Sequence, residues 1–454
     1  MFRKSRLRLH YLQAAFAIRI LFFFSVPSPL DFKINRLTER EISGRLVEIE
    51  RALSESKIKY YVYDDVEMRR PDLRRCVIEE VNLTWPFPWG ERFKDYAKWE
   101  VRYLEALEMH PYRTDNFSHA DFFLIPIPFG ALLTAGSRND IRRALESLFA
   151  KATFQQSPSQ NVLFTFIEPL FERAKVKKFE RYSGLSWADY EKMKDIVLVK
   201  DKDTHLWHQK LATQEAKKGY WTNGMAEELE GVAPMTRFCW SLSFAGVATD
   251  EAFLDLSNNE DIALTSFKNK SNYFFYHTTK AASLNNSTVF RHALVTSNVS
   301  SALCQPSSIG FGISKEEWAK SLQDSKFCLV IRGDNPNSRS LFRSIRNGCI
   351  PIVISDMLPS YAPIFRSLLK MEDYAILLKE EDFISDPVGT LNNASILSNF
   401  SINKFLNGIK IVQRMILPDH PHSLFVPAFC HETVASMKQI YQVPNEGNGG
   451  LASV

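Results

Sequence analysis

The sequence predicts an α/β protein, and three observations lead to this prediction. Short apolar runs rich in branched and aromatic residues alternate with stretches whose apolar residues recur at helical spacing, as strands and helices do in layered α/β domains. The chain has 454 residues, enough for two domains with a core each. The segment 326–356 contains a strand, a loop, a helix and a second strand, a connection that requires parallel strands.

The first thirty residues have the pattern of a targeting segment. A basic start is followed by an apolar run over 11–26 that Arg19 interrupts, and a bilayer crossing needs about twenty residues. We expect a signal-anchor over 1–30; an uncleaved signal sequence and a disordered basic leader are the alternatives. The basic flank would keep the N-terminus in the cytosol. We therefore expect a single-pass type II protein of the Golgi membrane with the remainder of the chain in the lumen, or else an ER or secreted protein.

Two further features favour the secretory route. Glycan acceptors of the form Asn-x-Ser/Thr are frequent, and they begin at Asn82, Asn116, Asn269, Asn285, Asn286, Asn298, Asn393 and Asn399. The six cysteines permit disulfides in that compartment. Cys328 and Cys349 lie on apolar runs, where buried free thiols are equally consistent with the sequence.

A stem helix is expected over 31–57. Thr38 and Glu41 have the spacing of a capping box, and apolar residues follow at helical intervals. The helix could pack on the body of the protein or pair with another chain. The expected strands are the apolar runs at 60–63, 121–127, 161–167, 195–199, 238–244, 273–277, 327–331 and 349–354. The polar, glycine-containing stretch 213–236 predicts a boundary between domains at 58–230 and 231–454.

The segment 326–356 predicts a phosphate site. Pro336 suits a first helical turn, Asp334 or Asn335 can cap that turn, and the helix begins beyond the carboxyl end of the first strand. Phosphates bind at this position in open parallel sheets. Arg332 and Arg339 flank the point, and Ser338 adds a hydroxyl. The tripeptide 332–334 is also the one that integrins read, but a loop between buried strands is a poor place for adhesion.

The same segment resembles the exostosin family of glycosyltransferases. The matching motifs are Phe327-Cys328, Arg332-Gly333-Asp334, Leu341-Phe342, Gly348-Cys349-Ile350-Pro351 and Ser355-Asp356. Weaker likeness at 61–64, 103–128 and 374–383 extends the resemblance over roughly 60–385. The resemblance implies the GT-B type of fold, two Rossmann-like domains facing across a cleft, with the acceptor on the N-terminal domain and the nucleotide sugar on the C-terminal one.

The implied reaction is an inverting transfer of a sugar from a nucleotide diphosphate sugar, expected to be a UDP-sugar, onto a hydroxyl of a polysaccharide or glycan. The residues expected to bind the nucleotide sugar are Arg332, Asp334, Ser338, Arg339, Ser355 and Asp356; Asp356 could equally cap the following turn. No metal and no cofactor besides the donor are expected, because arginine and helix amides can neutralise the diphosphate. The acidic pair in 201–203 has metal-binding spacing but suits a solvated loop.

The base that accepts the acceptor's proton should project from the N-terminal domain. Asp64 closes the first strand, where ligands gather, and it matches the last residue of the family's Tyr-x-Tyr-Asp motif. Asp121 opens its strand and should face the opposite edge. A structural carboxylate in the turn is the alternative interpretation of Asp64.

Two departures from the family pattern bear on activity. Arg343 stands where the family usually has an acidic residue, and Ser340 stands where it commonly has arginine. They favour an alternative function, a non-catalytic exostosin-like partner or carbohydrate-binding subunit of another transferase. A membrane contact is expected through the N-terminus. Nucleic acid is not an expected partner, because the net charge is only +4 and the basic residues are dispersed.

Overall fold

The computed structural model describes residues 39–83, 90–165, 187–193, 196–200, 238–241, 264–278, 294, 303, 306–311, 313–332, 340–361 and 364–442. The described helices are α2 (Glu39–Ser54), α3 (Val66–Arg69), α4 (Pro71–Glu79), α5 (Gly90–Met109), α6 (Phe129–Thr134), α7 (Arg138–Phe149), α8 (Ala152–Gln156), α10 (Trp187–Met193), α14 (Leu264–Asn269), α17 (Lys315–Gln323), α18 (Ser340–Arg346), α19 (Leu358–Tyr361), α20 (Glu380–Ser385), α21 (Pro387–Ser395), α22 (Asn399–Ile416) and α23 (Phe425–Gln442). The expected anchor at 1–30 and the boundary stretch 213–236 lie outside the described residues.

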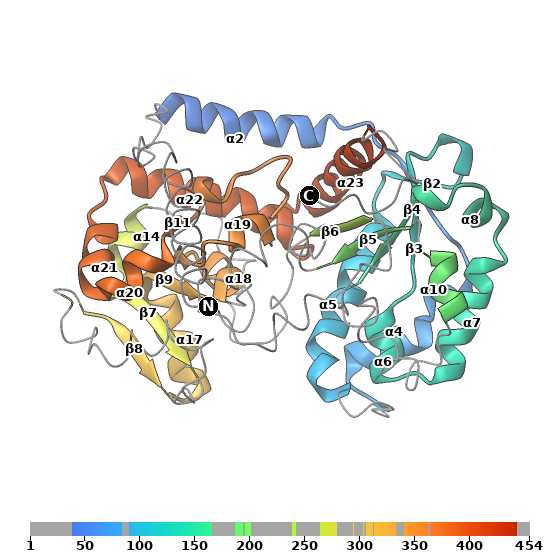
Figure 1. Ribbon diagram of the computed structural model, residues 1–454, viewed down its shortest axis with the longest axis horizontal. Helices are drawn as coiled ribbons and strands as arrows, with labels where there is room; N and C mark the ends of the chain where they lie inside the picture. Colours follow the sequence, from blue (N-terminus) through green and yellow to red (C-terminus); the bar gives the residue numbers. More distant parts are fainter. Residues whose placement is uncertain are drawn as a thin grey trace, which may run out of the picture. The chain divides into compact units, whose positions relative to one another are not determined.

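The first sheet is parallel and has the strand order β2-β1-β3-β4-β5-β6 (Figure 1). Its strands are β1 (Tyr60–Val62), β2 (Arg113–Thr114), β3 (Phe122–Ile125), β4 (Asn161–Phe164), β5 (Val197–Lys200) and β6 (Phe238–Ser241). β3 and β4 are buried along their whole length, which explains their continuous apolar sequence. β2 lies on one side of β1 and β3 on the other, so the order in which strands are added reverses there, and this sheet has a topological switch point after β1.

The second sheet is also parallel, with the order β11-β10-β9-β7-β8. Its strands are β7 (Asn272–Thr278), β8 (Ser308–Phe311), β9 (Ser325–Ile331), β10 (Ile350–Ile354) and β11 (Ile376–Leu378). The corresponding switch point lies between β7 and β9. The predicted α/β class is therefore confirmed. All eight expected strands are present, and the sequence missed the short strands β2, β8 and β11.

The stem helix α2 packs on the body of the chain. Leu46, Ile49 and Leu53 are buried. Arg45 forms an ion pair with Asp373 at 3.2 Å, and Glu50 forms one with Arg414 at 2.9 Å. The sequence left open whether the helix packs on the body of the protein or pairs with another chain. In the structure the apolar face of the helix packs on the body of the protein.

The C-terminal helix α23 contributes aromatic side chains to the core around the first sheet. The ring of Phe429 packs against Phe122 and Phe164, each with ring centres 6.1 Å apart. Phe425 packs edge-on against Tyr103 at 4.7 Å. Strands that start the chain and a helix near its end thus share one apolar core, which such aromatic contacts stabilise beyond simple burial.

Candidate functional site

Arg332 follows directly after β9 and lies in the interior. Its side chain is 0% exposed, and its Nε lies 3.0 Å from Oε1 of Glu380, whose side chain is 1% exposed. A guanidinium is costly to bury unless a carboxylate accompanies it, and Glu380 supplies that charge. The structure therefore directs Arg332 toward α20. Its role as a phosphate ligand stays a prediction.

Glu380 also joins the carboxyl ends of two neighbouring strands. Its Oε1 accepts a hydrogen bond from the backbone N–H of Asp356 at 3.2 Å, and its own N–H donates to Oδ1 of Asp356 at 3.0 Å. Ser355, the first residue after β10, is buried, whereas Asp356, which follows it, is exposed; Glu380 follows β11. Each of the two carboxylates thus accepts a hydrogen bond from the other residue's backbone N–H. These two bonds connect the ends of β10 and β11 at the edge where a ligand is expected, and Asp356 satisfies a backbone N–H at the start of α20.

The remaining predicted contacts to the nucleotide sugar fall on the loop 333–339. Asp334, Ser338 and Arg339 lie outside the described residues, so the structure brings together three of the six predicted residues, Arg332, Ser355 and Asp356.

A small cavity lies against β7 and β9, the two strands of the switch point. Its volume is about 20 Å³, room for one small group, since one water needs about 10–15 Å³. It is lined by Phe275, Tyr276, His277, Trp318, Leu322, Cys328, Leu329, Ser340, Arg343 and Ser344. Arg343 is the one charged side chain among these lining residues, and polar and apolar groups contribute to the wall in similar measure.

Aromatic contacts hold Arg343 in this position. The guanidinium carbon lies 4.9 Å from the centre of the Trp318 ring, an attractive cation–π contact. Trp318 in turn packs edge-on against Phe275, with ring centres 5.5 Å apart and an angle of 79°. The helices α17 and α18, which precede and follow β9 in the sequence, thus meet at the cavity.

His277 contributes a neutral polar edge to the cavity. Its Nε2 lies 2.8 Å from Oγ of Ser308. Burial lowers the pKa of His277 below its ordinary value of 6.5, so the imidazole is uncharged near pH 7. Nδ1 is buried and has no hydrogen-bond partner among the residues that the structure describes.

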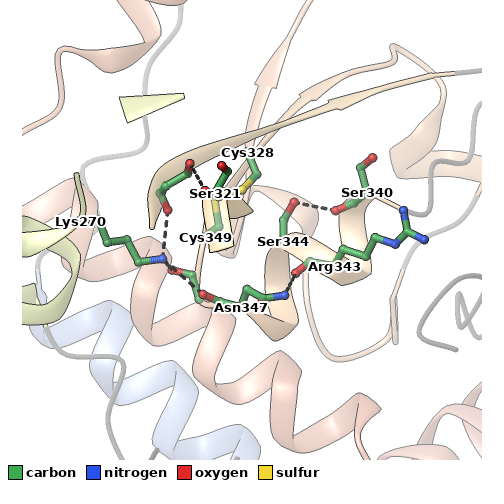
Figure 2. The surroundings of a disulfide bond; sticks show 10 residues. Lys270, Ser321, Cys328, Ser340, Arg343, Ser344, Asn347 and Cys349 are labelled. Atoms are coloured by element: carbon green, nitrogen blue, oxygen red, sulfur yellow. Dashed lines mark hydrogen bonds between the residues drawn. A yellow bond between two sulfur atoms is a disulfide. The ribbon is translucent and has the colours of Figure 1, made fainter. Parts of the chain in front are cut away.

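The far end of α18 is fixed by a disulfide and a lysine (Figure 2). Cys328 and Cys349 form a disulfide with their Cα atoms 5.8 Å apart, so of the two states that the sequence leaves open the bonded one is present. Nζ of Lys270 donates to the carbonyls of Ser325, Asn347 and Gly348 at 3.0, 3.3 and 3.2 Å. Burial lowers the pKa of Lys270 to about 8.

A glycine follows this end of α18. Gly348 has φ of 59°, the left-handed conformation that glycine adopts at a helix end. Figure 2 shows the Arg343 side chain extending toward the Ser340 end of the helix, away from Lys270. The helix that carries Arg343 is therefore anchored at one end and presents its cation at the other.

The predicted base Asp64 lies in a different environment. Its side chain is 69% exposed and forms an ion pair with Arg69 at 2.8 Å. Arg69 also lies 3.3 Å from Glu108. Asp121 accepts a hydrogen bond from the backbone N–H of Lys59 at 2.8 Å, at the opposite, amino-terminal edge of the sheet. The two aspartates thus occupy the two edges that their sequence positions predict.

Three important residues were missed from the sequence. Glu380 lies in the segment 374–383, and an acidic residue two positions after a third strand was the available signal. Trp318 and His277 meet Arg343 only through the fold, and nothing local in the sequence marks them. No group of three His, Cys, Asp or Glu residues suited to a metal ion occurs in the part of the chain that the structure describes.

The fold and this site define a class of protein. Two parallel sheets flanked by helices, with charged groups at strand ends of the second sheet, are consistent with a GT-B-like glycosyltransferase. Residues 255–394 match the family model of the Exostosin GT47 domain. Over these residues the match confirms the resemblance to the exostosin family that the sequence predicts.

One curated relative supports the same assignment. The Exostosin-1 homolog of Caenorhabditis elegans is 37% identical over 71 residues. This alignment covers 16% of the present chain and 18% of the relative. Among the residues that the structure describes, none of the helices combines the length and the apolar character that crossing a membrane requires.

Proposed function

We propose that this protein transfers a sugar from a nucleotide diphosphate sugar, most simply a UDP-sugar, to a hydroxyl of a polysaccharide or glycan. The match of 255–394 to the Exostosin GT47 domain carries the proposal. The matched segment contains all five strands of the second sheet and the cavity at its switch point. In this proposal the second sheet and its helices bind the donor, and the first sheet, which includes β6 from beyond residue 230, binds the acceptor.

The proposed reaction is a single displacement with inversion. The acceptor oxygen attacks the anomeric carbon, the bond from that carbon to the diphosphate breaks, and the electron pair leaves with the nucleotide diphosphate. The acceptor proton passes to a base, for which we propose Asp64. Fixed positive groups beside the second sheet stabilise the leaving diphosphate without a metal ion. No cofactor besides the donor takes part.

The proposed setting is the Golgi lumen, with the N-terminus in the membrane. The disulfide between Cys328 and Cys349 supports an oxidising compartment. Five of the glycan acceptors are exposed, namely Asn82, Asn116, Asn269, Asn393 and Asn399, so glycans could attach at these positions. Mapping of the attached glycans by mass spectrometry after expression in animal cells tests this setting.

A second candidate is a non-catalytic partner subunit. Arg343 in place of the family's usual carboxylate favours it, and so does the enclosure of Arg332 by Glu380. In this case the chain would bind a transferase or a glycan without turning over a donor.

Calorimetric titration of the purified full-length chain with UDP and with GDP separates the two candidates. Micromolar binding of UDP, followed by release of UDP from a UDP-sugar when a glycan acceptor is added, supports the transferase. A folded sample that binds neither nucleotide contradicts the free-standing enzyme and leaves the partner subunit.

A further inference from the structure

We propose that N-linked glycans attached at Asn116 and Asn399 cover apolar side chains that the fold leaves exposed to solvent. The inference rests on the proposed function, because it assumes the lumenal setting in which such glycans are added. It gives these two acceptors a task in the folded protein, which is to keep the apolar surface beside them from associating with other chains.

The large apolar side chains that are exposed lie mostly beside glycan acceptors. In the part of the chain that the structure describes, the exposed large apolar residues are Val47, Val66, Ile78, Val81, Met109, Phe117, Ile396 and Phe400. Those within four residues of an exposed acceptor asparagine are Ile78, Val81, Phe117, Ile396 and Phe400. Single exposed apolar residues are ordinary on protein surfaces. Their concentration beside acceptors is what connects the apolar surface with the glycans.

Asn116 lies where apolar surface and a sheet edge coincide. β2 is the first strand in the order of its sheet, so one side of it has no neighbouring strand among the described residues. Phe117, three residues after β2, is 52% exposed. Oδ1 of Asn116 accepts a hydrogen bond from the backbone N–H of Ser118 at 3.0 Å, which leaves Nδ2, the atom that carries a glycan, on the other side of the amide. A glycan here would cover Phe117 and hinder another chain from pairing with the sheet edge.

Asn399 begins α22 beside a second apolar group. Ile396 is 79% exposed and Phe400 is 37% exposed, and both lie within three residues of Asn399. Ser398 caps the helix, because its Oγ accepts a hydrogen bond from the backbone N–H of Ser401 at 3.1 Å. Asn399 and Phe400 are therefore held in the first helical turn, and a glycan on Asn399 starts from a fixed position beside the apolar side chains.

Asn269, by contrast, is an exposed acceptor on polar surface. It ends α14, and none of the exposed large apolar residues lies near it in the sequence. Phe267 is buried, and Nζ of Lys270 donates to three backbone carbonyls. A glycan at Asn269 would therefore cover no apolar side chain, and this acceptor serves as the control.

The test measures dye binding by the full-length chain expressed in animal cells, after mass spectrometry has mapped its glycans. Ser118→Ala removes the acceptor at Asn116 and keeps the Asn116 side chain, Asn399→Gln removes the second acceptor, and Ser271→Ala removes the control acceptor at Asn269. We expect glycans at Asn116 and Asn399. We expect each of the first two variants to bind about threefold more anilinonaphthalene sulfonate, a dye for exposed apolar surface, and the control to stay within about 1.3-fold of wild type.

A double variant tests whether the uncovered ring causes the effect. Phe117→Ser combined with Ser118→Ala should return dye binding to about the wild-type level, and thermal melts establish that each variant is folded. Dye binding that Ser118→Ala and Asn399→Gln both leave unchanged overturns the inference. So does a chain with a glycan at Asn269 and none at Asn116 and Asn399. Dimerisation of the glycosylated wild type that Phe117→Ser abolishes, measured by analytical ultracentrifugation, also overturns it, because a second copy would then cover Phe117.

The inference and the proposed function fail in different ways. A chain that carries no glycan contradicts the lumenal setting and overturns this inference with it. A glycosylated chain that gives the expected dye binding but binds neither UDP nor GDP supports this inference and contradicts the proposed transferase.

Discussion

The two sheets have equivalent strand orders around their switch points, yet the charged groups beside those points differ in burial. After β1, Asp64 is exposed and pairs with Arg69, only five residues away. After β9, Arg332 is fully buried and pairs with Glu380, which is contributed by a distant strand end. The strand order that both sheets share places a charged residue at the carboxyl edge of each sheet. Burial and long-range packing then decide whether a charge remains available to solvent or becomes part of the scaffold.

The comparison is tested most strongly by removing the buried charge at the second switch point. Glu380→Gln leaves the guanidinium of Arg332 without its carboxylate in a fully buried position. We expect a loss of about 3–5 kcal/mol in the free energy of unfolding, measured by urea denaturation. The neighbouring Glu381 is exposed on the same helix, so Glu381→Gln should change stability by less than about 0.5 kcal/mol. Equal effects of the two substitutions would contradict the structural role of the pair.

Removing the disulfide beside the second sheet is expected to have the next largest effect on the free energy of unfolding. Cys328→Ala together with Cys349→Ala opens a crosslink between residues 21 positions apart, for which chain entropy predicts a loss of about 3 kcal/mol. Cys76 on α4 is a free, half-buried thiol of the first half, and Cys76→Ala should cost less than about 1 kcal/mol. Thermal unfolding of the three proteins measures both values. Alkylation of Cys328 and Cys349 in the native protein without a reductant would show that the bond is absent.

The strands could be predicted because parallel strands buried on both faces leave continuous apolar runs in the sequence. β2 and β8 were missed because Arg113 in β2 and Ser308 and Gly310 in β8 interrupt any apolar run, and β11 was missed because its three apolar residues, Ile376–Leu378, are too few to distinguish a strand from a helix. The segment 326–356 could also be identified from the sequence, through the motif that contains Gly348 and through the polar residues at the ends of its strands. The pairs Arg332–Glu380 and Arg343–Trp318 could not be predicted in this way, since their partners are 48 and 25 positions apart and meet only through sheet pairing and helix packing.

The pH dependence of stability tests how strongly burial beside the second sheet lowers the pKa of Lys270. Its pKa in the folded protein is about 8, below the ordinary 10.5, so between these values the unfolded chain binds more protons than the folded one. The stability contributed by this group is therefore full above pH 10.5 and is lost as the pH falls through 8.

We expect wild type to gain about 1.5 kcal/mol relative to Lys270→Met between pH 8 and pH 9.5. Taking the difference between the two proteins removes the titration of other groups. A constant difference across this range would mean that the ammonium keeps its ordinary pKa. In that case the three carbonyls compensate for burial completely.

The smallest effect on stability is expected at the first switch point. Asp64→Asn breaks an exposed ion pair with Arg69 and should change the free energy of unfolding by less than about 1 kcal/mol. If Asp64 is the proposed base, transfer should nevertheless fall by a factor of about 100 or more, with UDP binding unchanged. Asp121→Asn at the opposite edge is the control and should leave transfer within about threefold of wild type, although it weakens a hydrogen bond from Lys59. Transfer that survives Asp64→Asn would show that another residue is the base. Asp64 would then be an exposed carboxylate that matches a sequence motif but takes no part in the reaction.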